Sequence, residues 1–257
     1  MNREKYSKFL QVLSVGLSLK LILIGSLPMR VQAKSIDFSS DSSIPTNLSA
    51  SVTFDPPGNG KPKDTVGGAS RDAGLCPQDA VNSGPSITPV MPTNDRALTV
   101  ADRPTFFVYI PQTSAPKAMF VLRDDNEDYY YKTTLPIPSK AGIVSFKLPA
   151  DAPAMESGKS YKWSFVLMCS SEIRPDSPWV EGEIQRVEAN GTENATLNNL
   201  SPVERAAIYG KNGIWYDTIA SLAEQRRSQP DNLTLATNWE NLLKSVGLDA
   251  IANQPLL

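Results

Sequence analysis

The sequence of 257 residues predicts an α+β protein, in which an antiparallel β-sandwich is followed by a small helical segment. Three observations predict this order. Short apolar and aromatic segments, separated by turn residues, recur between residues 96 and 190. Amphipathic stretches with helix-capping signals follow in residues 200–257. A stretch rich in Pro, Gly and Ser precedes both, in residues 34–95, and is typical of a partly disordered linker.

Residues 1–33 have the features of a secretory signal peptide. A basic start precedes an apolar stretch, and Val31-Gln32-Ala33 has the small side chains of a cleavage site. We expect cleavage after Ala33 and export to the periplasm or cell envelope; the alternative is an uncleaved N-terminal anchor. No later segment is apolar enough to predict a membrane span.

The linker carries Cys76, and the only other cysteine is Cys169. An even number of cysteines outside the cytoplasm favours a disulfide bond between them. The alternative is a pair of buried thiols.

Six strands are expected in the sandwich, at residues 105–110, 118–123, 129–134, 142–148, 159–169 and 179–187. Segment 159–169 gives the clearest signal, because Tyr161, Trp163 and Phe165 alternate with smaller or polar residues. The passage from Gly158 to Trp163 looks like the start of a strand in immunoglobulin or fibronectin modules. The sequence therefore predicts a sandwich of that kind.

Three helices are expected at residues 202–209, 214–227 and 233–246. Ser201, Pro202 and Glu204 form an N-terminal capping signal for the first helix. The first two helices resemble a tetratricopeptide repeat at Ala206, Tyr209, Gly213, Trp215, Asp217, Leu222 and Pro230. Such a hairpin is a protein-contact surface, and Trp215 is expected to lie in its core. A single repeat is too short for a free-standing array, so we expect it to dock on the sandwich.

The composition excludes several kinds of chemistry. The chain has no histidine, which removes Ser-His-Asp and Cys-His catalysis and imidazole metal sites. Without residues 1–33, the chain has 20 basic and 26 acidic residues, a net charge of −6 that does not favour nucleic-acid binding. The sequence predicts no catalytic, cofactor-binding or metal-binding residues.

Three residue groups offer weaker alternatives. The segment 124–128 begins like a calcium loop, but Tyr129 and Leu135 stand where glycine and glutamate are required, which favours a solvated hairpin tip. Carboxylates around the last strands could serve a histidine-free hydrolase, although acidic residues on a solvent face are commoner: Glu172, Asp176, Glu181 and Glu183. Tyr129, Tyr131 and Trp179 could form an aromatic platform for sugars, or strand core.

Several longer passages resemble a family of exported cyanobacterial proteins catalogued as domain of unknown function 928. They are Pro56-Pro57-Gly58, Thr65 to Arg71 before Cys76-Pro77, Leu98 to Phe106, Tyr161 to Trp163 before Cys169, Val180 to Gly182, Glu204 to Ala207, and Gly213 to Asp217. The resemblance implies a periplasmic or envelope location and no assigned activity.

Together, these features predict an exported, non-enzymatic binding or scaffolding protein without a cofactor. Its expected partners are proteins of the envelope. A carbohydrate-binding module and a histidine-free carboxylate hydrolase remain the alternatives.

Overall fold

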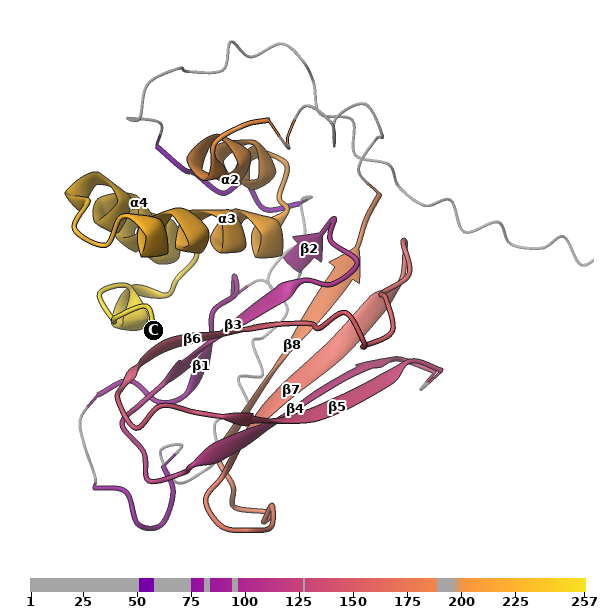
Figure 1. Ribbon diagram of the computed structural model, residues 1–257, viewed down its shortest axis with the longest axis vertical. Coiled ribbons are helices and arrows are strands. Elements are labelled where there is room, and N and C mark those ends of the chain that lie inside the picture. The colour runs from indigo at the N-terminus through magenta and orange to yellow at the C-terminus, as the bar shows by residue number, and fades with distance from the viewer. Residues whose placement is uncertain are drawn as a thin grey trace, which may run out of the picture. The chain divides into compact units, whose positions relative to one another are not determined.

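The computed structural model describes residues 51–57, 75–80, 84–93, 97–126, 128–188, 197 and 199–257 (Figure 1). The predicted signal peptide and its cleavage site at Ala33 lie outside these residues, as does much of the linker. The described part is a mixed α+β protein with eight strands in two sheets and three α-helices. Every strand and helix expected from the sequence is present, with bounds shifted by at most two residues.

Two sheets form the β part. The order of the larger sheet is β2 (Ala97–Thr99), β8 (Trp179–Arg186), β7 (Ser160–Met168), β4 (Lys117–Asp124) and β5 (Tyr130–Pro136). The order of the smaller sheet is β1 (Thr88–Pro89), β3 (Thr105–Ile110) and β6 (Gly142–Lys147). The prediction of wholly antiparallel sheets was wrong in one place, because β2 pairs with β8 in parallel.

The smaller sheet lies between the larger sheet and the helices. On one face of the smaller sheet, Phe106 packs against the larger sheet. The centroid of its ring lies 4.8 Å from that of Phe120 of β4 and 5.6 Å from that of Trp163 of β7. Successive strand residues point to opposite faces. The neighbouring Phe107 accordingly points the other way and meets Trp239 of the third helix at 6.5 Å. We call the three-stranded sheet the middle sheet.

The helices are α2 (Pro202–Lys211), α3 (Trp215–Ser228) and α4 (Leu233–Ser245), followed by the short 3-10 helix η1 (Asp249–Ile251). Figure 1 shows them together on one side of the sheets. The predicted capping box is confirmed, because Ser201 and Glu204 each bond the other's main-chain N–H. Among the described residues, no helix has the length and apolar character needed to cross a bilayer.

The first turn of α3 attaches the helices to both sheets. Trp215 is fully buried, as predicted, and its Nε1 donates to the Val90 carbonyl oxygen at 2.9 Å, next to β1. The hydroxyl of Tyr216 accepts a hydrogen bond from Nε1 of Trp163, on β7, at 2.7 Å. Asp217 binds the end of β2. Three successive residues therefore hold three separate parts of the β structure.

The hairpin of α2 and α3 is filled by an upstream segment of the same chain, residues 51–57. Phe54 is buried and meets Trp215 edge-on, with 5.0 Å between centroids. The main-chain N–H of Asp55 donates to the carbonyl oxygen of Gly210 at 2.9 Å. A side chain at Gly210 would overlap the carbonyl oxygen of Thr53, so this close contact requires glycine. Part of the surface of this hairpin is thus intramolecular core.

The predicted disulfide bond is confirmed. Cys76 and Cys169 are bonded, with their Cα atoms 5.4 Å apart. Asp79 fixes the Cys76 segment beside the connection between β3 and β4, because its carboxylate accepts from Thr113 Oγ1 at 2.7 Å and from Ser114 N at 2.6 Å. Burial raises the pKa of Asp79, but its hydrogen bonds outweigh that effect and leave the pKa below its usual value.

The last residues of the chain extend the edge of the middle sheet. The main-chain N–H of Ile143 donates to the Pro255 carbonyl oxygen at 2.7 Å, and the N–H of Leu257 donates to the Ile143 carbonyl oxygen at 2.9 Å. A Cβ on Gly142 would stand only 2.6 Å from the Leu257 side chain, so the tail packs directly against the start of β6.

Candidate functional site between the middle sheet and the helices

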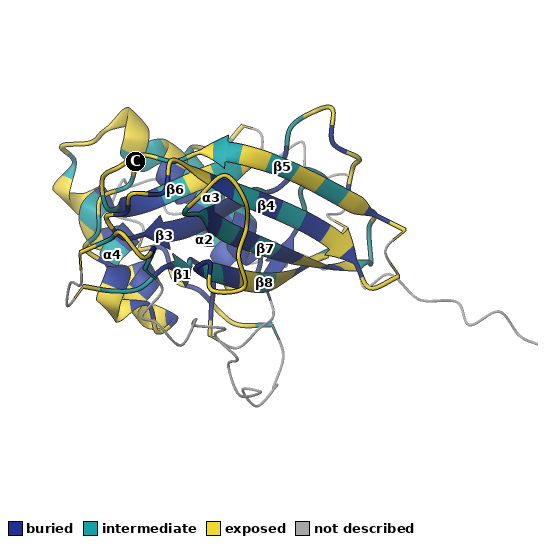
Figure 2. Ribbon diagram, turned by 90° about the horizontal axis from the view of Figure 1, so that it is seen from below, coloured by how far each residue is buried: buried dark blue, intermediate teal, exposed yellow. Residues whose placement is uncertain are grey.

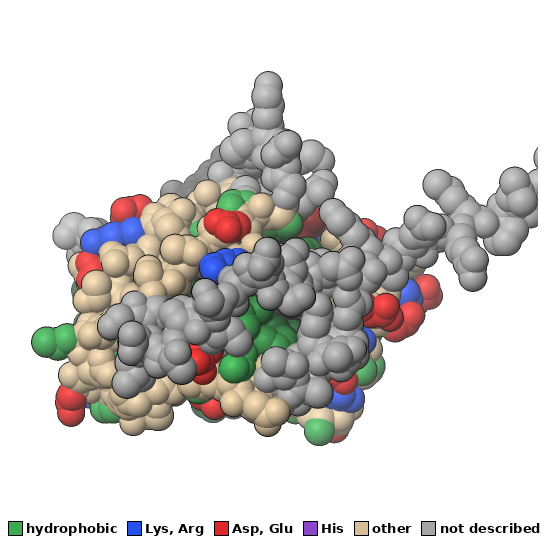
Figure 3. Space-filling model, turned by 90° about the horizontal axis from the view of Figure 1, so that it is seen from above, with side chains coloured by type: hydrophobic (Ala, Val, Ile, Leu, Met, Phe, Trp, Pro, Cys, Tyr) green, Lys and Arg blue, Asp and Glu red, His purple; other side chains and the backbone are tan. Residues whose placement is uncertain are grey.

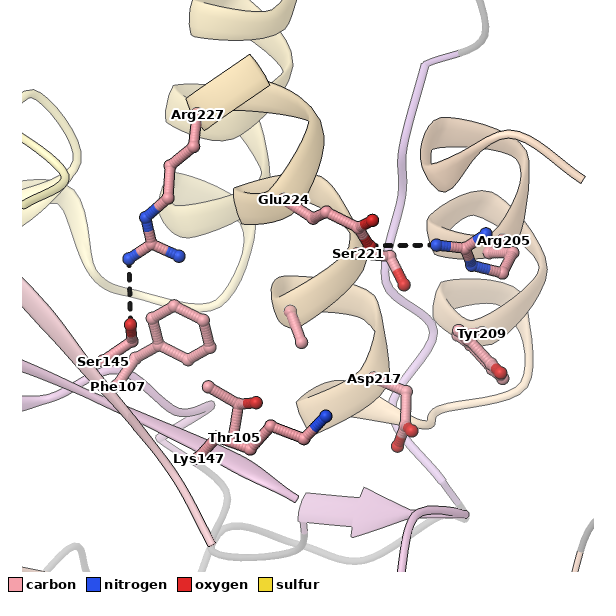
Figure 4. A pocket seen from close by; sticks show the side chains of 11 residues that line it. Thr105, Phe107, Ser145, Lys147, Arg205, Tyr209, Asp217, Ser221, Glu224 and Arg227 are labelled. Carbon is pink, nitrogen blue, oxygen red and sulfur yellow. Dashed lines mark hydrogen bonds and ion pairs between the residues drawn. The ribbon is translucent and has the colours of Figure 1, made fainter. Parts of the chain in front are cut away.

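A pocket of about 670 Å³ lies between the middle sheet and helices α2 and α3 (Figure 4). We call it the sheet–helix pocket. Its lining comes from four elements: Thr105 and Phe107 of β3, Ser145 and Lys147 of β6, Arg205 and Tyr209 of α2, and Asp217, Ala220, Ser221, Glu224 and Arg227 of α3.

Strand register and helix periodicity bring these side chains together. Thr105 pairs with Lys147 and Phe107 pairs with Ser145, so all four point to the helix side of the middle sheet. Arg205 and Tyr209 are four residues apart on α2, and positions 217, 221 and 224 of α3 follow the same helical spacing. The pocket therefore has a polar sheet floor and two polar helix walls.

Two arginines close the pocket at its ends. Arg205 Nη2 lies 3.0 Å from Glu224 Oε2, an ion pair that joins α2 to α3. Arg227 donates to Ser145 Oγ and to the main-chain oxygen of Leu257, both at 2.9 Å, and so joins α3 to β6 and the tail. Partial burial lowers the pKa of the Arg227 guanidinium.

Lys147 is the cation in the pocket that takes no part in these contacts. It is exposed, and within the described part of the chain it has neither an ion pair nor a hydrogen bond. Figure 4 shows its amino group directed toward the part of the pocket where Asp217 lies. This ammonium group is available to a ligand.

Asp217 links the pocket to the larger sheet. Its Oδ2 accepts hydrogen bonds from Thr99 Oγ1 at 2.8 Å and from the main-chain N–H of Val100 at 3.1 Å. Burial raises the pKa of the Asp217 carboxyl to about 6, although these two bonds act in the opposite direction. Burial and the nearby Asp217 charge also raise the pKa of Tyr209 to about 12, which keeps its hydroxyl protonated at neutral pH.

The pocket carries hydrogen-bond donors and acceptors of both charges, but its two carboxylates are already engaged. Asp217 holds the end of β2, and Glu224 holds Arg205. Acid–base catalysis by a carboxylate pair needs both groups directed at a substrate bond. Within the described ranges, no group of three or more His, Cys, Asp or Glu side chains is placed to hold a metal ion.

The structure does not bring the proposed aromatic platform together. Tyr129 is buried against Tyr161, at 5.0 Å between ring centroids, and its hydroxyl donates to the Pro153 carbonyl oxygen at 2.8 Å. Tyr131 pairs with a core residue of β4, whereas Trp179 pairs with Val166 on the outward face of the larger sheet. Tyr131 and Trp179 therefore point to opposite faces, because the pleat alternates side chains.

The acidic candidates also stay outside the pocket. Glu172, Asp176, Glu181 and Glu183 are exposed, and none of them lines the sheet–helix pocket. Asp124 is buried and its Oδ1 accepts from the Tyr129 N–H at 3.1 Å, closing the hairpin between β4 and β5. These residues form no carboxylate-lined cleft in the described chain.

Sequence reasoning did not assign the pocket residues to a site. In the sequence, Tyr209 and Asp217 stand out only as repeat positions, and Ser145 and Lys147 are unremarkable members of the strand expected at residues 142–148. The available signal was weak: a polar face on one predicted strand, opposite a polar helix stripe. Nothing in the sequence shows that these two faces meet.

Comparison with known families identifies the chain. The model of the family described as Domain of Unknown Function (DUF928) matches residues 66–256. The chain belongs to the DUF928 family. The match contains all eight strands, the three helices and every residue of the sheet–helix pocket, so these are parts of the DUF928 domain itself. A search of curated proteins finds no match.

Proposed function

We propose that this DUF928 protein is an exported, non-enzymatic binding protein of the periplasm or cell envelope. Its sheet–helix pocket would hold a polar segment of a protein partner. On this proposal, the two sheets serve as an immunoglobulin- or fibronectin-like scaffold, and the α2–α3 hairpin serves as a tetratricopeptide-like contact element. The disulfide bond supports export, because such bonds persist in oxidising compartments.

The observation that carries the proposal is the combination of size and chemistry in the pocket. Its volume of about 670 Å³ is typical of ligand sites. Peptide groups need both donors and acceptors, and the pocket offers an ammonium group on Lys147, hydroxyls on Tyr209 and Ser221, and Oε1 of Glu224, whose Oε2 pairs with Arg205. Its carboxylates are engaged in structural bonds, which favours binding over hydrolysis.

The surrounding surface favours a protein over a nucleic acid as the partner. On the helix side, Figure 3 shows acidic and basic side chains interspersed with uncharged ones. A nucleic-acid site would need a basic surface that follows the phosphates. The inner side of the hairpin already holds residues 51–57, so that side is not open to a partner, whereas the pocket side is.

The test is capture of envelope proteins by the exported chain, followed by binding measurements with the purified partner. Lys147→Glu and Glu224→Lys reverse charges in the pocket, and Lys140→Glu makes the same change as the first variant in the exposed β5–β6 turn. We expect wild type and Lys140→Glu to bind the same partner, and both pocket variants to bind it at least tenfold more weakly. Equal binding by all four proteins would contradict the proposal, as would hydrolytic turnover that Asp217→Asn abolishes.

A further inference from the structure

The outward face of the larger sheet carries apolar side chains where a solvated sheet face carries polar ones. Five half-buried residues form this outer patch: Met119 and Val121 of β4, Val166 and Met168 of β7, and Trp179 of β8. Their strand neighbours Phe120 and Phe165 are buried on the inward face, so alternation directs the five outward. Antiparallel sheets with one solvated face normally place polar residues there.

The outer patch is continuous across the sheet. Met119 pairs with Val166, and Val166 pairs with Trp179, which makes one apolar row over three strands. Val121 and Met168 stand two residues along their strands from this row, on the same face. The helices contact β2 and β3 and do not pack on the outward face of the larger sheet. Figure 2 shows strands β5, β4, β7 and β8 of this sheet side by side.

Charged residues flank the outer patch, with opposite signs on its two sides. Lys132 lies on β5 and Lys117 at the start of β4, whereas Glu181 and Glu183 lie on β8. All four are exposed, and Glu183 Oε1 lies 3.9 Å from the Lys162 ammonium group of β7, which leaves Glu181 as the acidic group of β8 without an ion pair among the described residues. An apolar centre with a polar rim is the usual anatomy of a protein interface, and Met and aromatic residues are enriched in such centres.

We infer that the outer patch binds a second copy of this chain, through a two-fold axis that runs parallel to the strands between β4 and β7. Such an axis places β5 of one copy over β8 of its partner. One cross-strand row consists of Lys132 of β5, Val121 of β4, Ser164 of β7 and Glu181 of β8. Strands β5 and β8 lie at equal distances from the axis, on opposite sides of it. Lys132 of each copy therefore meets the partner's Glu181 in an isologous contact.

The apolar row is self-complementary under the same axis. Met119 of one copy lies over the partner's Val166, and Trp179 lies over the partner's Thr134, which is the β5 member of that row. The next cross-strand row on this face contains Tyr130, Arg123 and Lys162. The axis would place Arg123 over the partner's Lys162, two groups of like charge. That ammonium group already has a carboxylate, since it lies 3.2 Å from Asp125 Oδ1 in its own chain.

Charge complementarity selects a second copy as the occupant. A different partner would need an acidic group opposite Lys132 of β5 and a basic group opposite Glu181 of β8, at the same separation as these two strands. The outer patch itself supplies that arrangement after a half-turn. Two sheets that pack face to face keep their strands within about 30° of each other, which an axis along the strands allows.

Analytical ultracentrifugation of the exported, disulfide-bonded chain tests the inference. We expect wild type to form a dimer, and Lys132→Glu and Glu181→Lys each to weaken dimerisation at least tenfold. An equimolar mixture of these two variants should regain dimers, because the reversed charges then face each other. Lys140→Glu, outside the patch, is the matched control and should dimerise like wild type.

Each other outcome overturns the inference. A monomeric wild type would show that the outer patch does not bind a second copy. A dimer that both variants leave intact would place the interface on another face. A mixture that stays monomeric would show that Lys132 and Glu181 do not meet across the axis. Because none of these variants lies in the sheet–helix pocket, failure here is separate from failure of the proposed binding function.

Discussion

The middle sheet and the larger sheet have similar inward faces but different outward faces. Phe106 and Phe146 of the middle sheet meet Phe120 of the larger one; Phe106 and Phe120 are buried, and Phe146 is half-buried. On its outward face, the middle sheet carries Ser145 and Lys147 and is covered by helices. The outward face of the larger sheet carries Met119 and Val166 without a helix layer.

The two outward faces both carry apolar and polar side chains, and they differ in whether helices cover them. The covered face is apolar at Phe107, Tyr109 and Ile143, which are buried, and polar at its other end, where Thr105, Ser145 and Lys147 line the pocket. The uncovered face carries the apolar outer patch within a charged rim, and such a patch is unfavourable in water unless another surface buries it. The two proposals follow this contrast, since one concerns the polar end of the covered face and the other concerns the outer patch.

The largest loss of stability is expected from removing the disulfide bond between Cys76, in the segment before β1, and Cys169, directly after β7. Cys76→Ser with Cys169→Ser removes a crosslink between positions 93 residues apart. In the chain-entropy model, closing such a loop stabilises the protein by about 4 kcal/mol. We expect urea unfolding to show that loss, with both sheets unfolding together. Wild type in reducing buffer is the control, and an unchanged midpoint in both samples would contradict the prediction.

A smaller, pH-dependent effect is expected where the helix layer meets β2. Burial raises the pKa of Asp217 from 3.8 to about 6, so the folded protein holds this proton more tightly than the unfolded chain. The associated stabilisation is complete below pH 3.8 and is lost as the pH rises through about 6. A shift of this size corresponds to about 3 kcal/mol.

Asp217→Asn isolates this effect, because the other carboxyl groups titrate alike in both proteins. We expect the unfolding free energy of wild type, relative to the variant, to fall between pH 4 and pH 7 by about 2 to 3 kcal/mol. Parallel stability curves across this range would show that the carboxyl group of Asp217 is not desolvated in the folded protein.

The smallest loss of stability is expected from breaking the hydrogen bond between Tyr216 of α3 and Trp163 of the larger sheet. Tyr216→Phe removes the acceptor of the Trp163 Nε1–H bond and leaves that buried N–H group unpaired. An unpaired buried donor costs about 1 to 3 kcal/mol. Tyr130→Phe, which removes an exposed hydroxyl on β5, is the matched control. Equal thermal denaturation of both variants would show that the Trp163–Tyr216 bond contributes nothing.

Local sequence signals predicted most elements of the fold but not all of them. Segment 159–169 was recognised as a strand because its apolar residues alternate over its whole length, and it forms β7. Strands β1 and β2, of two and three residues, were missed because a period of two cannot be read over so few positions. The parallel pairing of β2 with β8 joins residues far apart in the sequence and leaves no local pattern.

The candidate site was less predictable than the fold. Asp217 reads as one more polar residue in an amphipathic helix, yet its environment depends on Thr99 and Val100, more than a hundred residues upstream. The aromatic platform failed for a related reason. Strand alternation is visible in the sequence, but the faces of Tyr131 and Trp179 depend on the register with β4 and β7.

The sequence by itself determined the six longer strands, the three helices, the capping box at Ser201 and the cysteine pair. These follow from periodicity, local hydrogen bonding and composition, which act over a few residues. Only the tertiary structure decided which faces are covered. It laid residues 51–57 on the helical hairpin and opened the sheet–helix pocket, and it left the outer patch half-buried and without a helix layer. Those outcomes depend on contacts between distant segments, whose partners no local pattern specifies.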